Sequence, residues 1–197
     1  MKSKIISLQS MNIFHEHKKS YKMKVSKKII LTTIILFGLT TAKSQVAIGK
    51  QSVTNSSVSL EFSTTENRGL ILPYIENKTG ITENGTIIYD TTDHKVKYLK
   101  GGSWFDLSVD TTGTADLSIQ TGKTEQPGAK TVIGADGATN TTNGILVLSD
   151  NDKAMILPKV ASPHLNIKNP SPGMLVYDTT ARQLAIFNGT VWSFWKP

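Results

Sequence analysis

The chain repeats itself, and this duplication constrains its fold more than any other feature. Residues 85–92 read GTIIYDTT, and residues 173–180 read GMLVYDTT, 88 positions further on. Other blocks recur in the same order: 47–49 with 132–134, 70–73 with 155–158, 98–101 with 186–189, and Trp104 with Trp192. Self-similarity at a long period indicates that each copy is one structural unit.

The duplication divides the chain into four parts. Residues 1–44 form a leader, residues 45–108 the first copy, residues 109–130 a connector rich in Thr, Gly and Ser, and residues 131–197 the second copy. The connector contains one short apolar alternation around Leu117 and Ile119, so it is expected to contribute at most one strand to the fold.

Each copy is predicted to be a three-stranded antiparallel meander. Short apolar or alternating runs, typical of half-buried strands, are separated by Asp-Thr-Thr, Gly-Gly or Asn-Gly turns. The expected strands are 86–89, 95–98 and 103–107 in the first copy, and 174–177, 183–187 and 191–195 in the second. The fold class is therefore mainly β, with two tandem small antiparallel β-meander units after an N-terminal hydrophobic signal helix. Residues 161–172, with three prolines, are predicted to form an irregular loop with one helical turn at most.

The leader has the pattern of a secretory signal peptide. A basic stretch at 24–28 precedes an apolar run at 29–40, and Ala42 and Ser44 are the small residues of a cleavage site before Gln45. The apolar run is shorter than the roughly 20 residues that span a bilayer, which disfavours a retained anchor. Met23 is expected to be the start, with residues 1–22 an upstream extension. The mature protein is then exported, to the cell surface, the medium or the periplasm.

The basic charge of the chain is concentrated in this leader. Residues 1–44 hold nine of the 22 basic residues but one of the 15 acidic residues, which leaves 13 basic and 14 acidic residues in the rest. A nearly neutral body lacks the electrostatic surface that nucleic acid requires. The chain contains no cysteine, so disulfides and thiolate chemistry are excluded. Small units without disulfides favour a shared core or a homo-oligomer.

No motif for catalysis or cofactor binding is present. His94 and His164 are the histidines after the leader, and neither recurs in the other copy. Asp90 and Asp178 do recur, but each opens a predicted turn, and this explains them without catalysis. The oxygen-rich segments 136–144 and 150–152 do not match the ligand spacing of calcium loops. We therefore expect no enzyme activity, no cofactor and no metal, although a scattered hydrolase site stays open as an alternative.

Aromatic residues near the end of each copy are the candidate contacts. Trp104 and Trp192 are equivalent, and they are expected to close the small core of each meander. Trp195 has no aromatic counterpart in the first copy, so it is the better candidate for a partner or a sugar ring. The possible contact set is Trp195, Phe194, Trp192 and Trp104.

The pattern V-A-I-G, L-x-P, G-x-L-V-Y-D-T and N-G-x-x-W resembles the repeat modules of secreted Bacteroidota surface proteins, which are similar to tail-fibre and trimeric adhesin head segments. The resemblance covers nearly all of residues 46–195. It implies a structural or adhesive surface protein without catalysis and a homo-oligomer, with a trimer favoured. It also implies O-glycosylation at Asp-Thr-Thr, that is at Thr91, Thr111 and Thr179.

Two partner classes stay open from the sequence. A fibre or adhesin piece binds copies of itself and a surface protein, whereas a carbohydrate-binding module uses exposed aromatics near Trp195 to bind a glycan. Contact with a membrane is expected only through the signal peptide before cleavage.

Overall fold

The computed structural model describes residues 44–124, 126 and 128–196. The predicted signal helix, the alternative starts at Met1 and Met23, and most of the leader lie outside the described residues. The described part is mainly β, as predicted, with one short helix, α2 (Pro163–Asn166). This helix occupies the loop in which one helical turn was expected.

The strands of the two copies follow the same order along the chain. The first copy contains β1 (Val46–Ile48), β2 (Val58–Phe62), β3 (Leu70–Ile71), β4 (Tyr74–Ile75), β5 (Ile87–Asp90), β6 (Lys95–Lys100) and β7 (Ser103–Asp106). The second contains β8 (Thr131–Ile133), β9 (Leu146–Leu148), β10 (Ala154–Ile156), β11 (Lys159–Val160), β12 (Met174–Asp178), β13 (Gln183–Phe187) and β14 (Trp192–Trp195).

Equivalent backbone hydrogen bonds recur in both copies. The Tyr89 N–H donates to the Pro73 carbonyl at 3.0 Å, and the Tyr177 N–H donates to the Pro158 carbonyl at 2.8 Å. The prolines lack an N–H, but their carbonyls still accept, so the L-x-P segments bond to the meander that follows. The duplication seen in the sequence is therefore a duplication of local structure.

Each copy contains an antiparallel meander, β5-β6-β7 in the first and β12-β13-β14 in the second. The first turn of each is tight, because His94 and Arg182 occupy equivalent left-handed positions with φ of 60° and 55°. A short parallel strand extends each meander, with β4 beside β5 and β11 beside β12. The local strand prediction thus holds within about one to two residues.

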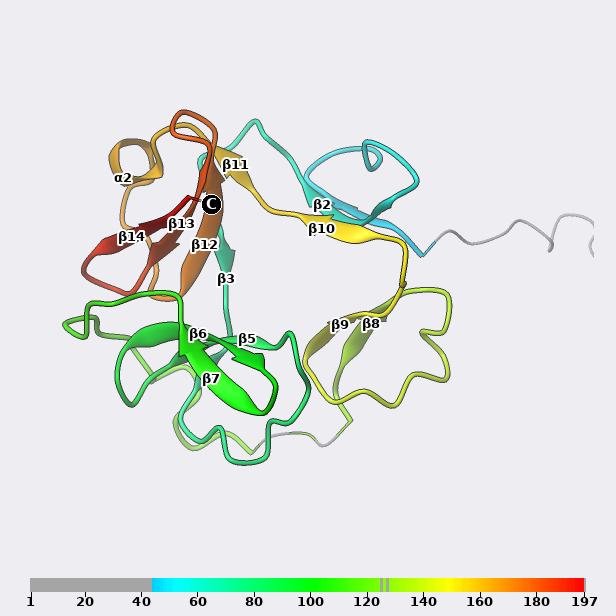
Figure 1. Cartoon of the computed structure of the whole chain (residues 1–197), viewed down its shortest axis with the longest axis horizontal. Coiled ribbons are helices and arrows are strands. Elements are labelled where there is room, and N and C mark those ends of the chain that lie inside the picture. The colour runs from blue at the N-terminus through cyan, green and yellow to red at the C-terminus, as the bar shows by residue number, and fades with distance from the viewer. Residues whose placement is uncertain (1–43, 125, 127, 197) are drawn as a thin grey trace, which may run out of the picture. The chain divides into compact units, whose positions relative to one another are not determined.

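The prediction of two separate tandem meander units is corrected by strand pairing between the copies. Strand β10 of the second copy pairs in parallel with β2 of the first, and β3 of the first pairs antiparallel with β12 of the second (Figure 1). Parallel pairs β1–β2 and β8–β9 precede the meanders. The arrangement is therefore solenoid-like, and the reason is that strands of two or three residues bury too little surface to stand alone.

The core lies partly within the second copy and partly between the copies. Residues Val160, Ile167, Met174, Val176, Ala185 and Phe187 form a cluster inside the second copy. A second cluster joins the first copy, through Leu72, Tyr89 and Val96, to the second, through Leu175 and Ile186. All five of these side chains are at most 8% exposed, so neither copy has a complete core without the other.

Candidate functional site

The aromatic side chains of strand β14 lie in different environments. Trp192 is half-buried and packs against the core cluster of the second copy, 5.3 Å from the Phe187 ring. Phe194 is 40% exposed, with its ring 5.7 Å from His164 in an edge contact. Trp195 is 46% exposed, and its indole N–H donates to the carbonyl of Leu107. The last two therefore present apolar surface to solvent, whereas Trp192 mainly closes the core.

An open pocket lies on the first copy beside Trp195. Its lining residues lie on β5, β6 and β7 or directly beside these strands, together with the Trp195 indole: Gly85, Ile87, Tyr98, Phe105, Asp106, Leu107 and Trp195. Phe105 is 44% exposed and stacks on Tyr98 at 5.4 Å. Trp104 lies on β7 next to Phe105 and is half-buried, but it does not line this pocket. The structure thus joins Trp195 with Phe105 and Tyr98, which the sequence did not group with it.

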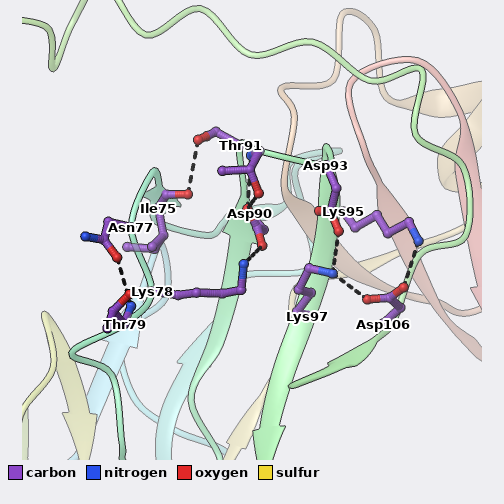
Figure 2. A network of polar contacts seen from close by, with 11 residues as sticks. Ile75, Asn77, Lys78, Thr79, Asp90, Thr91, Asp93, Lys95, Lys97 and Asp106 are labelled. Atoms are coloured by element: carbon purple, nitrogen blue, oxygen red, sulfur yellow. Dashed lines mark hydrogen bonds and ion pairs between the residues drawn. The ribbon is translucent and has the colours of Figure 1, made fainter. Parts of the chain in front are cut away.

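Charged residues form a network on the same meander. Lys97 lies between Asp93 and Asp106 (Figure 2). Its ammonium nitrogen is 2.6 Å from an oxygen of each. Lys95 reaches the other oxygen of Asp106 at 2.8 Å. Burial alone would lower the pKa of Lys97, but the two carboxylates hold the pKa of its ammonium above the ordinary value. The network ties the β5–β6 turn to β7, and its charges are already paired.

Asp90 and Asp178 are built into turns. Asp90 is 1% exposed, and its carboxylate accepts from Lys78 at 2.6 Å (Figure 2). It also accepts from the backbone N–H of Thr92 at 3.0 Å. Asp178 is 2% exposed and accepts from the N–H groups of Thr180 and Ser162. Burial would raise the pKa of each carboxyl, but these hydrogen bonds hold both pKa values below the ordinary value. A carboxylate kept ionised in this way lacks the raised pKa of a general acid.

The histidines lie on different elements. His94 occupies the β5–β6 turn and is half-buried, whereas His164 is exposed on α2. In the described part of the chain, no group of three or more His, Cys, Asp or Glu side chains is arranged to hold a metal ion. Over those same residues, no helix has both the length and the apolar character needed to cross a membrane.

The three Asp-Thr-Thr segments have different accessibility. Thr111 and Thr179 are exposed, whereas the half-buried Thr91 donates its hydroxyl to the Ile75 carbonyl at 3.1 Å. Asp110 caps its own turn by accepting from the N–H of Thr112 at 2.8 Å. The turn geometry is therefore common to all three segments, and glycosylation of these threonines stays a prediction.

One residue that the sequence did not single out joins the connector to the second copy. Asn188 is fully buried, and its amide nitrogen donates to the carbonyl of Asp110 at 2.9 Å. Its backbone carbonyl accepts the Tyr89 hydroxyl at 2.7 Å. The Asn-Gly pair in the sequence signalled a turn, but no local pattern indicated that its side chain reaches residues 78 positions earlier.

Comparison with known proteins gives a match over part of the chain. Residues 132–196, which coincide with the second copy, match the family model of a phage tail like trimerisation region. No curated protein and no solved structure matches the chain. The family match covers less than half of the sequence. It supports a tail-fibre-like trimeric β domain in the second copy, and hence a homo-oligomer.

Proposed function

We propose that this protein is a non-catalytic, exported structural subunit that assembles as a homotrimer into a fibre-like or adhesive surface element. The match of residues 132–196 to a trimerisation region is the observation that carries the proposal. The sequence duplication extends the argument to the first copy, because its strands follow the order of the matched segment.

The chemistry of the described residues supports a structural role. The buried carboxylates Glu61, Asp90 and Asp178 each accept hydrogen bonds from turns or lysines, which account for them structurally. The half-exposed aromatics Phe105, Phe194 and Trp195 are surfaces suited to a protein contact. Short edge strands add a second means of association between chains.

The solution mass tests this proposal directly. We expect light scattering on a sizing column to give three times the polypeptide mass, as measured on the same sample by mass spectrometry. The trimer should persist on dilution into the low micromolar range, because an obligate interface buries a large apolar area. A monomer at high protein concentration would contradict the proposed assembly.

Export is tested at the N-terminus of the mature protein. The pattern of the leader predicts that the protein in the envelope or medium begins at Gln45. Substitution of Ala42 by a bulky residue should block processing, and Thr40→Val, outside the small-residue pattern, is the matched control. Cytoplasmic protein that retains residues 24–44 would contradict export.

The aromatic pocket favours one alternative, a carbohydrate-binding module. Tyr98, Phe105 and Trp195 line it, and such rings stack on sugars. In that case a glycan array should show saturable binding that Trp195→Ala abolishes and Trp104→Ala retains. Absence of binding across the array, or equal binding by both variants, would count against the alternative.

A further inference from the structure

The contact between the two copies uses a surface of the second copy that has a partly covered equivalent in the first. In the second copy this surface consists of Gly173, Leu175 and Ile186, and the first copy covers it completely: Leu175 is 2% exposed and Ile186 is not exposed. We call it the receiving face. In the first copy the equivalent residues, 88 positions earlier, are Gly85, Ile87 and Tyr98.

The receiving face of the first copy is only partly covered: Ile87 packs against the cluster that joins the copies, whereas Gly85 is exposed. A Cβ atom built on Gly173 would lie 2.9 Å from the Cβ of Tyr89, whereas one built on Gly85 would meet no atom within 4 Å. Ile87 and Tyr98 are half-buried and line the pocket described above. The pocket therefore lies where, in the second copy, the receiving face is filled by Tyr89.

The surface of the first copy that covers the receiving face also has an equivalent in the second copy. That equivalent surface is only partly covered. In the first copy it consists of strand β3, Leu72, Tyr89 and Val96, all but β3 being at most 8% exposed. We call it the inserting face. Its equivalents in the second copy are residues 155–156 of β10, Leu157, Tyr177 and Leu184. Each of these is half-buried, and Leu157 and Leu184 already pack in part against the cluster that joins the copies.

Strand edges repeat the same pattern. Strand β3 pairs with the start of β12, with Met174 opposite Ile71 and Leu175 opposite Leu70. In the described residues, the strands that pair with β5 are β4 and β6, and β4 reaches only Tyr89 and Asp90. The edge of β5 at Thr86 and Ile87 thus corresponds to the edge that β3 occupies on β12.

Among the strands that the structure describes, β10 pairs with β2 alone, so its other edge is available for this pairing. The Ala154 N–H donates to the Ser57 carbonyl beside β2, so the alternation of a strand directs the backbone groups of Met155 and Leu157 to the opposite edge. The equivalent Leu72 N–H donates to the Gly173 carbonyl at 3.1 Å. The Leu157 N–H is accordingly placed to donate to a Gly85 carbonyl.

We infer that the receiving face of the first copy binds the inserting face of the second copy of another chain, in the geometry of the contact inside each chain. In this contact β10 of one chain pairs antiparallel with the edge of β5 of the next chain. Thr86 then lies opposite Ile156, and Ile87 lies opposite Met155. Tyr177 enters the pocket and packs on Gly85. The inference rests on the homo-oligomer proposed above, and a head-to-tail contact of this kind closes into a ring when the rotation between chains allows it.

Disulfide trapping tests the register, because the chain has no cysteine of its own. One chain carries Thr86→Cys and a second, tagged chain carries Ile156→Cys. Opposed residues of a non-hydrogen-bonded antiparallel pair lie about 4.5 Å apart at Cα, within disulfide range. After mixing, dissociation and reassembly, oxidation should give a tagged–untagged dimer in high yield. Met174→Cys with Ile71→Cys is the intrachain positive control, and Thr86→Cys with the exposed Lys168→Cys is the negative control.

A glycine pair gives a second measurement that needs no oxidation. Gly85→Ala should weaken assembly at least tenfold, because the added methyl group occupies the space that Tyr177 requires. Gly128→Ala is the matched control, since Gly128 has φ of 89°, close to the 87° of Gly85, and open space around it, but lies in the connector. Both variants carry the backbone strain, so their difference reports the contact.

The outcomes separate this inference from the proposed function. A specific disulfide together with weaker assembly of Gly85→Ala supports the head-to-tail contact. A stable trimer that gives no disulfide above the negative control overturns the contact and leaves the proposed function intact. A wild-type chain that is monomeric by light scattering overturns both.

Discussion

Replacement of Asn188 by alanine provides a sharp test of how the connector is attached. The side-chain amide donates to the Asp110 carbonyl at 2.9 Å and to its carboxylate at 3.0 Å. The amide oxygen accepts from the N–H groups of Thr190 and Val191 at 2.9 and 2.7 Å. Asn188→Ala removes all of these bonds and leaves the partly buried N–H groups of Thr190 and Val191 and the Asp110 carbonyl without this partner.

The expected loss follows from the number of bonds and their burial. A hydrogen bond contributes about 0.5–1.5 kcal/mol net, and the cost is greater when a buried partner stays unsatisfied. Bonds made by one side chain are not additive, so we expect a loss of about 2–4 kcal/mol in the free energy of unfolding. That is a large part of the roughly 5–15 kcal/mol available to a domain.

Urea denaturation followed by tryptophan fluorescence measures this loss. With a slope of about 2 kcal/mol per molar urea, the midpoint should fall by about 1–2 M. Lys100→Ala is the matched control, because Lys100 is the exposed equivalent in the first copy and should change stability by less than about 0.5 kcal/mol. Both are compared at one protein concentration, since assembly adds to apparent stability. Equal midpoints for the two variants would refute the anchoring role of Asn188.

Three further predictions follow from other positions. Gly173→Ala should lower the free energy of unfolding by at least about 2 kcal/mol, because the residue has φ of 71° and the added methyl group would press on Tyr89. A thermal melt measures this loss, and an unchanged melting temperature would contradict the close packing. Burial would raise the pKa of Glu61, but hydrogen bonds from Lys50 and Thr54 outweigh it and lower this pKa to about 2. The ionised Glu61 therefore contributes its full stability above pH 4.5, and this contribution is lost as the pH falls toward 2. The urea midpoint of the wild type should therefore drop over that pH range, and the midpoint of Glu61→Gln should drop less. Midpoints of the two proteins that fall in parallel with pH would contradict this role of Glu61. His94→Val should lower the free energy of unfolding by about 1–3 kcal/mol, because His94 has φ of 60°, which a β-branched residue tolerates poorly and asparagine tolerates well. Equal stability of His94→Val and His94→Asn would exclude backbone strain as the cause.

The sequence predicted the meanders well because their signals are local. Turn residues such as Asp90 and Asp178 hold their own backbone, and alternation in 95–98 identifies β6 directly. The parallel pairs β1–β2 and β8–β9 were missed. Such strands are joined through long connections, and no adjacent turn specifies their register.

The pairing between copies could not be read from the sequence for a related reason. Strand β3 has two residues, and its partner β12 lies about a hundred positions later. The candidate aromatics were found, but their grouping was not, because Trp195 meets Phe105 and Tyr98 only through the packing of one meander on the other. Long-range packing, which local patterns do not encode, thus decides where the pocket forms.

The strand pairing and packing between the copies also set when the chain can fold during its synthesis. Tyr89 is buried partly by Leu175 and hydrogen-bonds Asn188, so the first copy cannot complete its core until the second has left the ribosome. At about 5–20 residues per second, that delay is on the order of 5–20 seconds. During this interval the exposed edges of β2 and β5 are open to wrong partners. A nascent chain that waits this long benefits from a chaperone or from early capture by an export pathway.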